Sequence, residues 1–414
     1  MIIRMFYIIL SLLILPTLNV QADSYLITNA RLAGDDAAAP KISLLIKDGR
    51  IADVGSEITA SDDVERIDAN GGIVTPGLMN SATRLGLIEL YSAKETVDYK
   101  GSFHNLGAAF DVQYGLNSNS VLLDVARSEG LARAVVIPDG SDKSHFAGLG
   151  LLLHLREGAE ILHKPRAMLV VEAGGTGVNK ASRSAVWLTV RQALRKAQKA
   201  KKDVDEATEI LQSVLSGTIP LVIKASRESD IRQAINLGKD FKVRIVIIGG
   251  EEAWRVAPAL AAQNIAVIIN PYDILPATFD AIGSRGENPA ILHKAGVKIG
   301  FAVTSIFKSH NAGTAMRISA GFAVSRGLDK QAALEAMTKN PAEIWGIAED
   351  YGTLEVGKVA DIVIWSGDPL EPLTIAEKIF IDGKMIAIKS RQMQLRDKYH
   401  PFRNNTAYPP AYQK

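Results

Sequence analysis

Residues 220–225 read PLVIKA, residues 244–250 read RIVIIGG and residues 265–270 read IAVIIN. Each run is rich in valine and isoleucine and is apolar at consecutive positions, which is typical of strands buried on both faces. Three further runs of this kind lie at 134–138, 167–173 and 297–303. Helical patterns separate several runs, as at 183–200, where apolar residues recur at spacings of three and four.

Strands that alternate with helices over this length predict a parallel sheet. The sheet is either an open doubly wound sheet or a closed (β/α)8 barrel, and periodicity does not separate the two. Ligands lie at the carboxyl ends of the strands in both folds, so the residues that end each run are the candidates for a site.

Hairpin patterns stand near both ends of the chain. ISLLIKDGRIADV at 42–54 and KIFIDGKMI at 378–386 each place Asp-Gly between two apolar arms, and DIVIW at 361–365 indicates a further strand. The pattern therefore favours a small β unit built from both termini, with the α/β part between them.

The first residues resemble a secretory signal. Arg4 precedes an apolar run at 6–18, and Val20 and Ala22 supply a small-x-small end, so we expect cleavage after Ala22 and a periplasmic or secreted protein. The run is shorter than the ~20 residues that span a bilayer, so no stable membrane anchor is expected after cleavage.

Composition excludes several kinds of site. The chain has no cysteine, which rules out thiolate metal ligands and cysteine nucleophiles. Its formal net charge of +2 gives no reason to expect nucleic acid as a partner.

VTPGLMNSATRLG at 74–86 is similar to the first barrel strand of the amidohydrolase superfamily, which reads close to V-x-P-G-[LF]-I-D-x-H-x-H-x-G. Residues 220–241 resemble a strand-helix segment of the imidazolonepropionase-like branch. Further segments resemble the family in the same order, at 245–269, 295–313, 323–347 and 352–372.

The resemblance implies a (β/α)8 TIM-like barrel with a small β-sandwich formed by both chain termini. On this basis we expect a signal peptide at 1–22, sandwich strands at 23–73 and 351–390, and the barrel at 74–350. An irregular tail is expected at 391–414.

Members of this family bind zinc or another divalent metal through histidines and an aspartate at the barrel mouth. In this sequence the matching positions hold residues that are poor ligands: Ala82, Arg84, Lys224, Gly249 and Thr304 (or Ser305 with a one-residue slip). We therefore expect a degenerate metal site and no cofactor.

Arg84 and Lys224 both fall in the space that the metals would fill. We hypothesise that they replace the lost positive charge and neutralise a leftover carboxylate, for which Glu172 at the end of 167–173 is the candidate. Such a pocket would favour a small anionic or amide ligand. His310 is a further candidate at the barrel mouth, whereas His154 and His163 are expected to flank a helical stretch.

Three functions stay open. The first is a pseudoenzyme derived from hydrolases of carbon-nitrogen bonds (non-peptide or dipeptide-like amides). It would bind a ligand or act as a partner subunit, in a homo- or hetero-oligomer with an H-x-H-containing amidohydrolase. The second is an active metal-independent amidohydrolase, with Lys224 of lowered pKa as base and Thr304 or His310 assisting. The third is a periplasmic solute-binding protein.

Overall fold

The computed structural model describes residues 24–34, 39–101, 106–141, 144–174, 182–276, 278–303 and 310–399. The expected signal peptide and the candidates Thr304 and Ser305 lie outside these residues.

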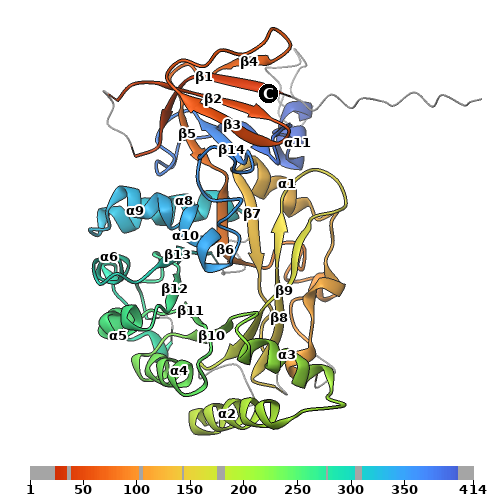
Figure 1. Cartoon of the computed structure of the whole chain (residues 1–414), viewed down its shortest axis with the longest axis vertical. Helices are drawn as coiled ribbons and strands as arrows, with labels where there is room; N and C mark the ends of the chain where they lie inside the picture. Colours follow the sequence, from red (N-terminus) through yellow and green to blue (C-terminus); the bar gives the residue numbers. More distant parts are fainter. Residues whose placement is uncertain are drawn as a thin grey trace, which may run out of the picture.

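Strands from both ends of the described chain form one eight-stranded sheet, which Figure 1 shows at the top of the molecule. Its hydrogen-bonded order is β16-β15-β14-β5-β1-β2-β3, with β4 paired to β1. The strands are β1 (Tyr25–Leu32), β2 (Ile42–Lys47), β3 (Arg50–Gly55), β4 (Glu65–Asp68), β5 (Ile73–Pro76), β14 (Ile362–Trp365), β15 (Ala376–Ile381) and β16 (Lys384–Ile386). We call it the terminal sheet.

A second eight-stranded sheet runs in the order β13-β12-β11-β10-β9-β8-β7-β6, and its two edge strands contact each other, so it is a nearly closed barrel. Its strands are β6 (Leu78–Thr83), β7 (Leu131–Val136), β8 (Phe146–His154), β9 (Leu162–Glu172), β10 (Leu221–Ala225), β11 (Ile245–Gly249), β12 (Ala266–Ile269) and β13 (Ile299–Phe301). The closed alternative of the sequence prediction is therefore the one that the chain adopts.

Helices cover the outside of the barrel. The described helices of the chain are α1 (Val121–Ser128), α2 (Arg183–Lys199), α3 (Glu206–Leu215), α4 (Glu228–Phe241), α5 (Ala257–Ala262), α6 (Asn288–Lys294), α8 (Ala312–Ser325), α9 (Lys330–Glu335), α10 (Lys339–Ile344) and α11 (Arg391–Tyr399). Helix α10 packs into the barrel interior, and α11 lies beside the terminal sheet. Short 3-10 turns occur at Lys94–Thr96, Gly107–Ala109, Val112–Gly115, Ala253–Val256 and Phe279–Ala281. Among the described helices, none has the length and apolarity to cross a membrane.

The barrel strands are apolar on both faces because each face packs against a different core. Val222 of β10 points into the barrel interior, where it joins Val246 and Ile268. Its neighbours Leu221 and Ile223 belong to the core between the sheet and the helices. The consecutive apolar residues that indicated buried strands thus follow from burial on both sides.

The barrel departs from eight parallel strands at β8. This strand pairs antiparallel with both β7 and β9, and the described residues of the two connections contain no helix. His154 therefore ends β8 and His163 lies in β9, so the expectation that they flank a helix is wrong. The backbone of β8 accounts for this departure from a strand-helix-strand connection. Gly148 has a positive φ of 113°, and the β8–β9 pairing is irregular beside it.

The gap between the edge strands β6 and β13 is bridged by backbone of the segment between α9 and α10. The amide of Met79 donates to the carbonyl oxygen of Met337 at 2.8 Å, and the amide of Phe301 donates to that of Ala336 at 2.9 Å. These two carbonyl groups satisfy donors on both edges, so residues 336–337 complete the ring where the strands do not pair.

The expected irregular tail begins with a helix. Residues 391–399 form α11, in which no residue is buried, and the hydroxyl of Ser390 accepts a hydrogen bond from the amide of Met393. Local capping and good helix-forming residues account for this helix, which the absence of an apolar period concealed.

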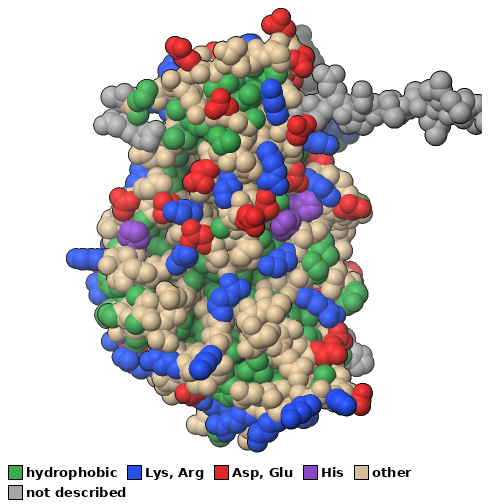
Figure 2. Space-filling model, in the orientation of Figure 1, with side chains coloured by type: hydrophobic (Ala, Val, Ile, Leu, Met, Phe, Trp, Pro, Cys, Tyr) green, Lys and Arg blue, Asp and Glu red, His purple; other side chains and the backbone are tan. Residues whose placement is uncertain are grey.

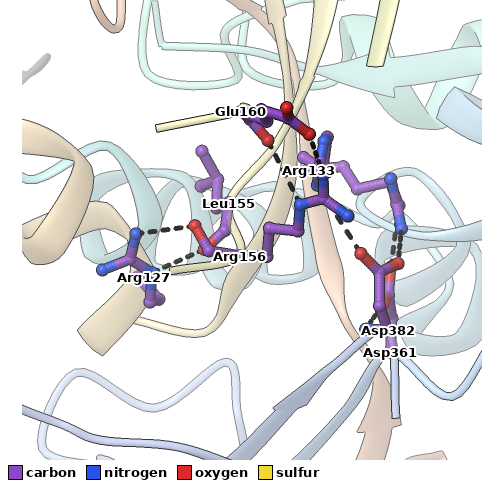
Figure 3. Close-up of polar contacts among 8 residues, drawn as sticks. Arg127, Arg133, Leu155, Arg156, Glu160, Asp361 and Asp382 are labelled. Atoms are coloured by element: carbon purple, nitrogen blue, oxygen red, sulfur yellow. Dashed lines mark hydrogen bonds and ion pairs between the residues drawn. The ribbon is translucent and has the colours of Figure 1, made fainter. Parts of the chain in front are cut away.

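The two sheets are joined closely at Gly77, which separates β5 from β6. A Cβ atom at this position would lie 2.4 Å from the Cβ atom of Ala132, so the approach of the chain to β7 requires glycine. Beside this junction, Arg133 of β7 is 3% exposed and donates to Asp361 at 2.8 Å and to Asp382 at 2.7 Å (Figure 3). Both carboxylates come from the terminal sheet region, so a buried ion pair holds the sheet to the barrel.

Replacement of Arg133 should cost far more stability than replacement of an exposed arginine. Arg133→Met leaves two carboxylates without their cation, and we expect a loss of about 3–5 kcal/mol in the free energy of unfolding. Arg50→Met is the control, because the Arg50–Asp350 pair is about half exposed and should cost less than about 1 kcal/mol. Urea denaturation of both variants measures the difference, and equal losses would contradict the structural role of Arg133.

Candidate functional site

A cavity of about 440 Å³ opens at the carboxyl ends of the barrel strands. Its floor is apolar, with Ile137, Ile248 and Ile268, and its walls are polar and charged. The described charged residues in the walls are Arg84, Asp139, Glu172, Lys224, Glu251, Asp273 and Asp280. This is the position at which barrels of this kind hold their ligands.

Lys224 is the central cation of the cavity. The parallel register of β9 and β10 places it directly beside Glu172, and its ammonium group donates to that carboxylate at 2.8 Å. It also donates to Asp139 and to the carbonyl oxygen of Pro138, each at 2.8 Å. An ammonium group has three protons to donate, so Lys224 is fully satisfied inside the cavity wall.

Arg84 binds the second oxygen of the Asp139 carboxylate, on the side away from Lys224. Its Nη2 atom donates to Oδ2 of Asp139, and its guanidinium group lies over the ring of Tyr99, 4.3 Å from the centroid. Glu172 in turn accepts from the amide of Gly140 at 3.1 Å. Two cations and two carboxylates therefore form one network, which we call the mouth network: Arg84, Asp139, Lys224 and Glu172.

The mouth network favours the ionised states of Asp139 and Lys224. Burial would raise the pKa of Asp139, but Lys224 and Arg84 outweigh it and lower this pKa to about 2. Burial would lower the pKa of Lys224, but Glu172 and Asp139 leave it above its ordinary value. A lowered pKa was the premise for Lys224 as a general base, and that premise is wrong because the two carboxylates stabilise the ammonium form.

The other sequence candidates lie apart from this network. Ala82 is completely buried in the barrel interior, and Gly249 lines the cavity with a positive φ of 100°. His310 is bonded through Nε2 to the carbonyl oxygen of Glu89 at 3.2 Å and is not among the residues that line the cavity. Thr304 lies outside the described residues.

The opposite wall of the cavity carries polar groups that the sequence did not single out. Burial raises the pKa of Glu251, and the charge of Asp273 adds to the shift. Atom Oε2 of Glu251 and atom Nδ2 of Asn270 are both buried and have no hydrogen-bond partner among the described residues. Buried polar atoms are almost always paired in proteins, so these two atoms mark the part of the wall where a water or a ligand would be bound.

Asp139 and Glu251 are two of the candidate site residues that the sequence analysis did not single out. Asp139 directly follows the apolar run 134–138, as Glu172 ends the run 167–173, so the strand-end criterion could have found it. Glu251 follows Gly249 and Gly250, both with positive φ, and only this turn directs it back to the cavity.

Comparison with known proteins gives a partial match to a family. Residues 260–387 match the model of the amidohydrolase family. Over this stretch the chain is similar to that family. It also shares its fold with an amidohydrolase from Thermotoga maritima, with a TM-score of 0.79 at 23% identity over 88% of this chain and 99% of that one.

Two curated proteins are similar in sequence. Amidohydrolase tasK of Hapsidospora irregularis is 25% identical over 385 residues, which cover 78% of this chain but only 38% of that protein. A dihydroorotase of Geotalea daltonii is 24% identical over 402 residues, which cover 85% of this chain and 91% of that protein. The chain thus spans well under half of the Hapsidospora amidohydrolase and nearly all of the dihydroorotase.

The described residues at the barrel mouth do not fit a divalent metal. Within the described part of the chain, no group of three or more His, Asp or Glu side chains is placed to hold a metal ion. The two carboxylates of the mouth network are already bound to Lys224 and Arg84. A dication ~4 Å from either cation would be repelled by about 8 kcal/mol at an effective dielectric constant near 20.

Loss of either cation should destabilise the protein. We expect Lys224→Ala to lower the free energy of unfolding by roughly 2–4 kcal/mol, because it leaves Asp139 and Glu172 without their shared partner. Arg84→Ala should have a smaller effect in the same direction, since it leaves Lys224 in place. Melting temperatures report both effects, with Arg50→Ala as an exposed control. Unchanged melting temperatures in both mouth variants would contradict the hypothesis that Arg84 and Lys224 replace the lost positive charge of the metals.

The mouth network should also be sensitive to acid. The pKa of Asp139 is depressed from 3.8 to about 2 in the folded state, so its contribution is full above pH ~4 and is lost as the pH falls towards ~2. We expect Asp139→Asn to be less stable than the natural protein by about 2 kcal/mol near neutral pH. The gap should close across that acid window. Urea denaturation at several pH values measures it, and a gap independent of pH would show that Asp139 is not held ionised.

Proposed function

We propose that this chain is an exported, imidazolonepropionase-like amidohydrolase homologue whose metal ligands have been replaced. In this proposal the terminal sheet is the family's β-sandwich. The barrel mouth binds a small ligand, or completes an assembly with an H-x-H-containing amidohydrolase subunit, and does not hydrolyse a carbon-nitrogen bond by the metal-dependent route.

The observation that supports this proposal most is the position of Lys224. Its ammonium group lies between Asp139 and Glu172, the carboxylates nearest to the expected metal position, and bonds to each at 2.8 Å. A metal would have to displace a fully bonded cation and then lie beside Arg84. The mouth network is therefore electrostatically complete without a metal, and no histidine is among the described residues that line the cavity.

The remaining polar groups of the cavity favour an amide ligand over an anion. Both cations of the described lining are bound by carboxylates, so they offer little attraction to an anion. The free Nδ2 atom of Asn270 donates, and Oε2 of Glu251 accepts or, when protonated, donates. A ligand with an adjacent carbonyl and N–H group would satisfy both atoms.

One observation favours a second candidate, a metal-independent amidohydrolase. Burial raises the pKa of Glu251, which is the direction of shift that favours a general acid. Ser226 lines the same cavity and would have to act with it. The solute-binding alternative has no comparable support, because the fold is a barrel and residues 260–387 are similar to the amidohydrolase family.

Elemental analysis and an activity screen test the proposal together. We expect the purified protein to contain zinc, manganese and iron only far below one equivalent. We also expect no turnover of N-acyl amino acids, dipeptides or cyclic amides, with or without added metal. Stoichiometric zinc, or turnover that a chelator abolishes, would contradict it. Turnover that resists the chelator but disappears in Glu251→Gln would favour the second candidate.

A matched variant shows whether the cations exclude the metal. The double variant Arg84→His with Lys224→His removes both positive charges and adds two imidazole groups beside Asp139 and Glu172. Its affinity for zinc, measured by calorimetry, should exceed that of the natural protein by at least about tenfold. Equal affinities would show that Arg84 and Lys224 do not block the site.

A further inference from the structure

Residues 183–202 read RSAVWLTVRQALRKAQKAKK and contain seven arginine or lysine residues without a single aspartate or glutamate. The whole chain is almost balanced, with 47 basic and 45 acidic residues. This stretch is therefore a local concentration of positive charge that the net charge of +2 conceals. It comprises helix α2 and the three residues that follow it.

The fold uses two of these cations internally and leaves the other five in solvent. Arg183 pairs with Asp230 and Asp280, and Arg191 pairs with Asp240. The other five are exposed and make no ion pair with a described residue: Arg195, Lys196, Lys199, Lys201 and Lys202. We call these five the basic patch.

Helix geometry directs the basic patch away from the barrel. The buried face of α2 consists of Val186, Trp187, Val190, Leu194 and Ala197. Leu188, Arg195 and Lys199 are spaced by seven and four residues, so they form a line along the opposite face. Leu188 is 57% exposed, although it is a large apolar residue.

The basic patch also lies at one end of the molecule. Figure 1 places α2 at the bottom, far from the terminal sheet, and Figure 2 shows arginine and lysine side chains gathered along the same lower edge. A flat surface could therefore contact all of α2's outer face without meeting the rest of the protein.

We propose that α2 and residues 200–202 dock this protein peripherally on a bilayer that contains anionic lipid. The convex outer face of a helix cannot enclose a small anion, but it can approach a plane of charged headgroups. Long lysine and arginine side chains are attracted to such a plane, and an exposed leucine among them can enter the boundary with the acyl chains. A nucleic acid or an acidic protein would use the cations but not Leu188.

This docking has a consequence for the cavity. Arg183, at the first turn of α2, pairs with Asp280, which lines the cavity wall. The helix has 17 residues and is therefore about 25 Å long. A membrane bound along α2 would thus lie within about one helix length of the cavity, whatever the cavity does.

Sedimentation with lipid vesicles tests the proposal on the full mature chain. Vesicles of phosphatidylcholine with roughly a third phosphatidylglycerol should bind the protein at about 0.1 M salt, whereas pure phosphatidylcholine vesicles should not. Binding should be lost at about 0.5 M salt. The variant Lys196→Glu, Lys199→Glu, Lys202→Glu should partition at least on the order of 100-fold more weakly. Leu188→Ser should weaken binding by a smaller factor.

The matched control reverses three exposed lysines elsewhere, with Lys294→Glu, Lys339→Glu and Lys389→Glu. This variant has the same net charge as the patch variant and should bind almost as the natural protein does. Circular dichroism shows that both variants are folded. Absence of binding to anionic vesicles, or equal loss in both variants, overturns the proposal. Binding of DNA or polyglutamate through the patch, without binding to vesicles, would assign it to a different anionic partner.

Discussion

The ammonium group of Lys224, held between Asp139 and Glu172, is the interaction on which the barrel mouth depends. Two strands, β7 and β9, bring carboxylates to this point at or just beyond their ends, and without a cation these two charges would repel each other inside a partly buried cavity. Lys224 is attached to β10, whose register with β9 is fixed by apolar residues on both faces. The electrostatics of the mouth therefore follow from the packing of the strands.

A bound metal and a lysine side chain can each neutralise the carboxylates of a barrel mouth, but the consequences differ. A metal ion neutralises carboxylates and also activates water, whereas an ammonium group only neutralises them. In this chain the ammonium group of Lys224 neutralises the carboxylates. Arg84, which stacks on Tyr99, binds the outer oxygen of Asp139. The opposite wall, with Glu251 and Asn270, retains polar atoms that no described residue satisfies. The mouth is thus stable on one side and open to a ligand on the other.

Sequence reasoning reached the buried strands and the Lys224–Glu172 contact because both depend on local patterns, whereas the closed barrel was implied only by the family resemblance. Runs of valine and isoleucine mark strands buried on two faces, and a charged residue at the end of such a run lies at the mouth. The antiparallel strand β8 was not predicted, because its segment, FAGLGLLLH, contains two glycines and is irregularly paired. The bridge through Met337 and Ala336 could not be predicted, since backbone carbonyl groups are the same in every residue. The basic patch was hidden by a balanced total charge.

The terminal sheet determines how much of the chain must be synthesised before the fold can be completed. Strand β5 lies between β1 and β14, and Thr75 is paired with Val363. The first strands of the chain therefore cannot complete their pairing until strands almost 300 residues later have been synthesised. The carbonyl groups that bridge β6 and β13 also come from this late part of the chain. A nascent chain that stops before residue 336 would expose both an unfinished sheet and an open barrel. Ribosomal synthesis must therefore run nearly to the end before either unit can close, and until then the early strands are dependent on protection from aggregation.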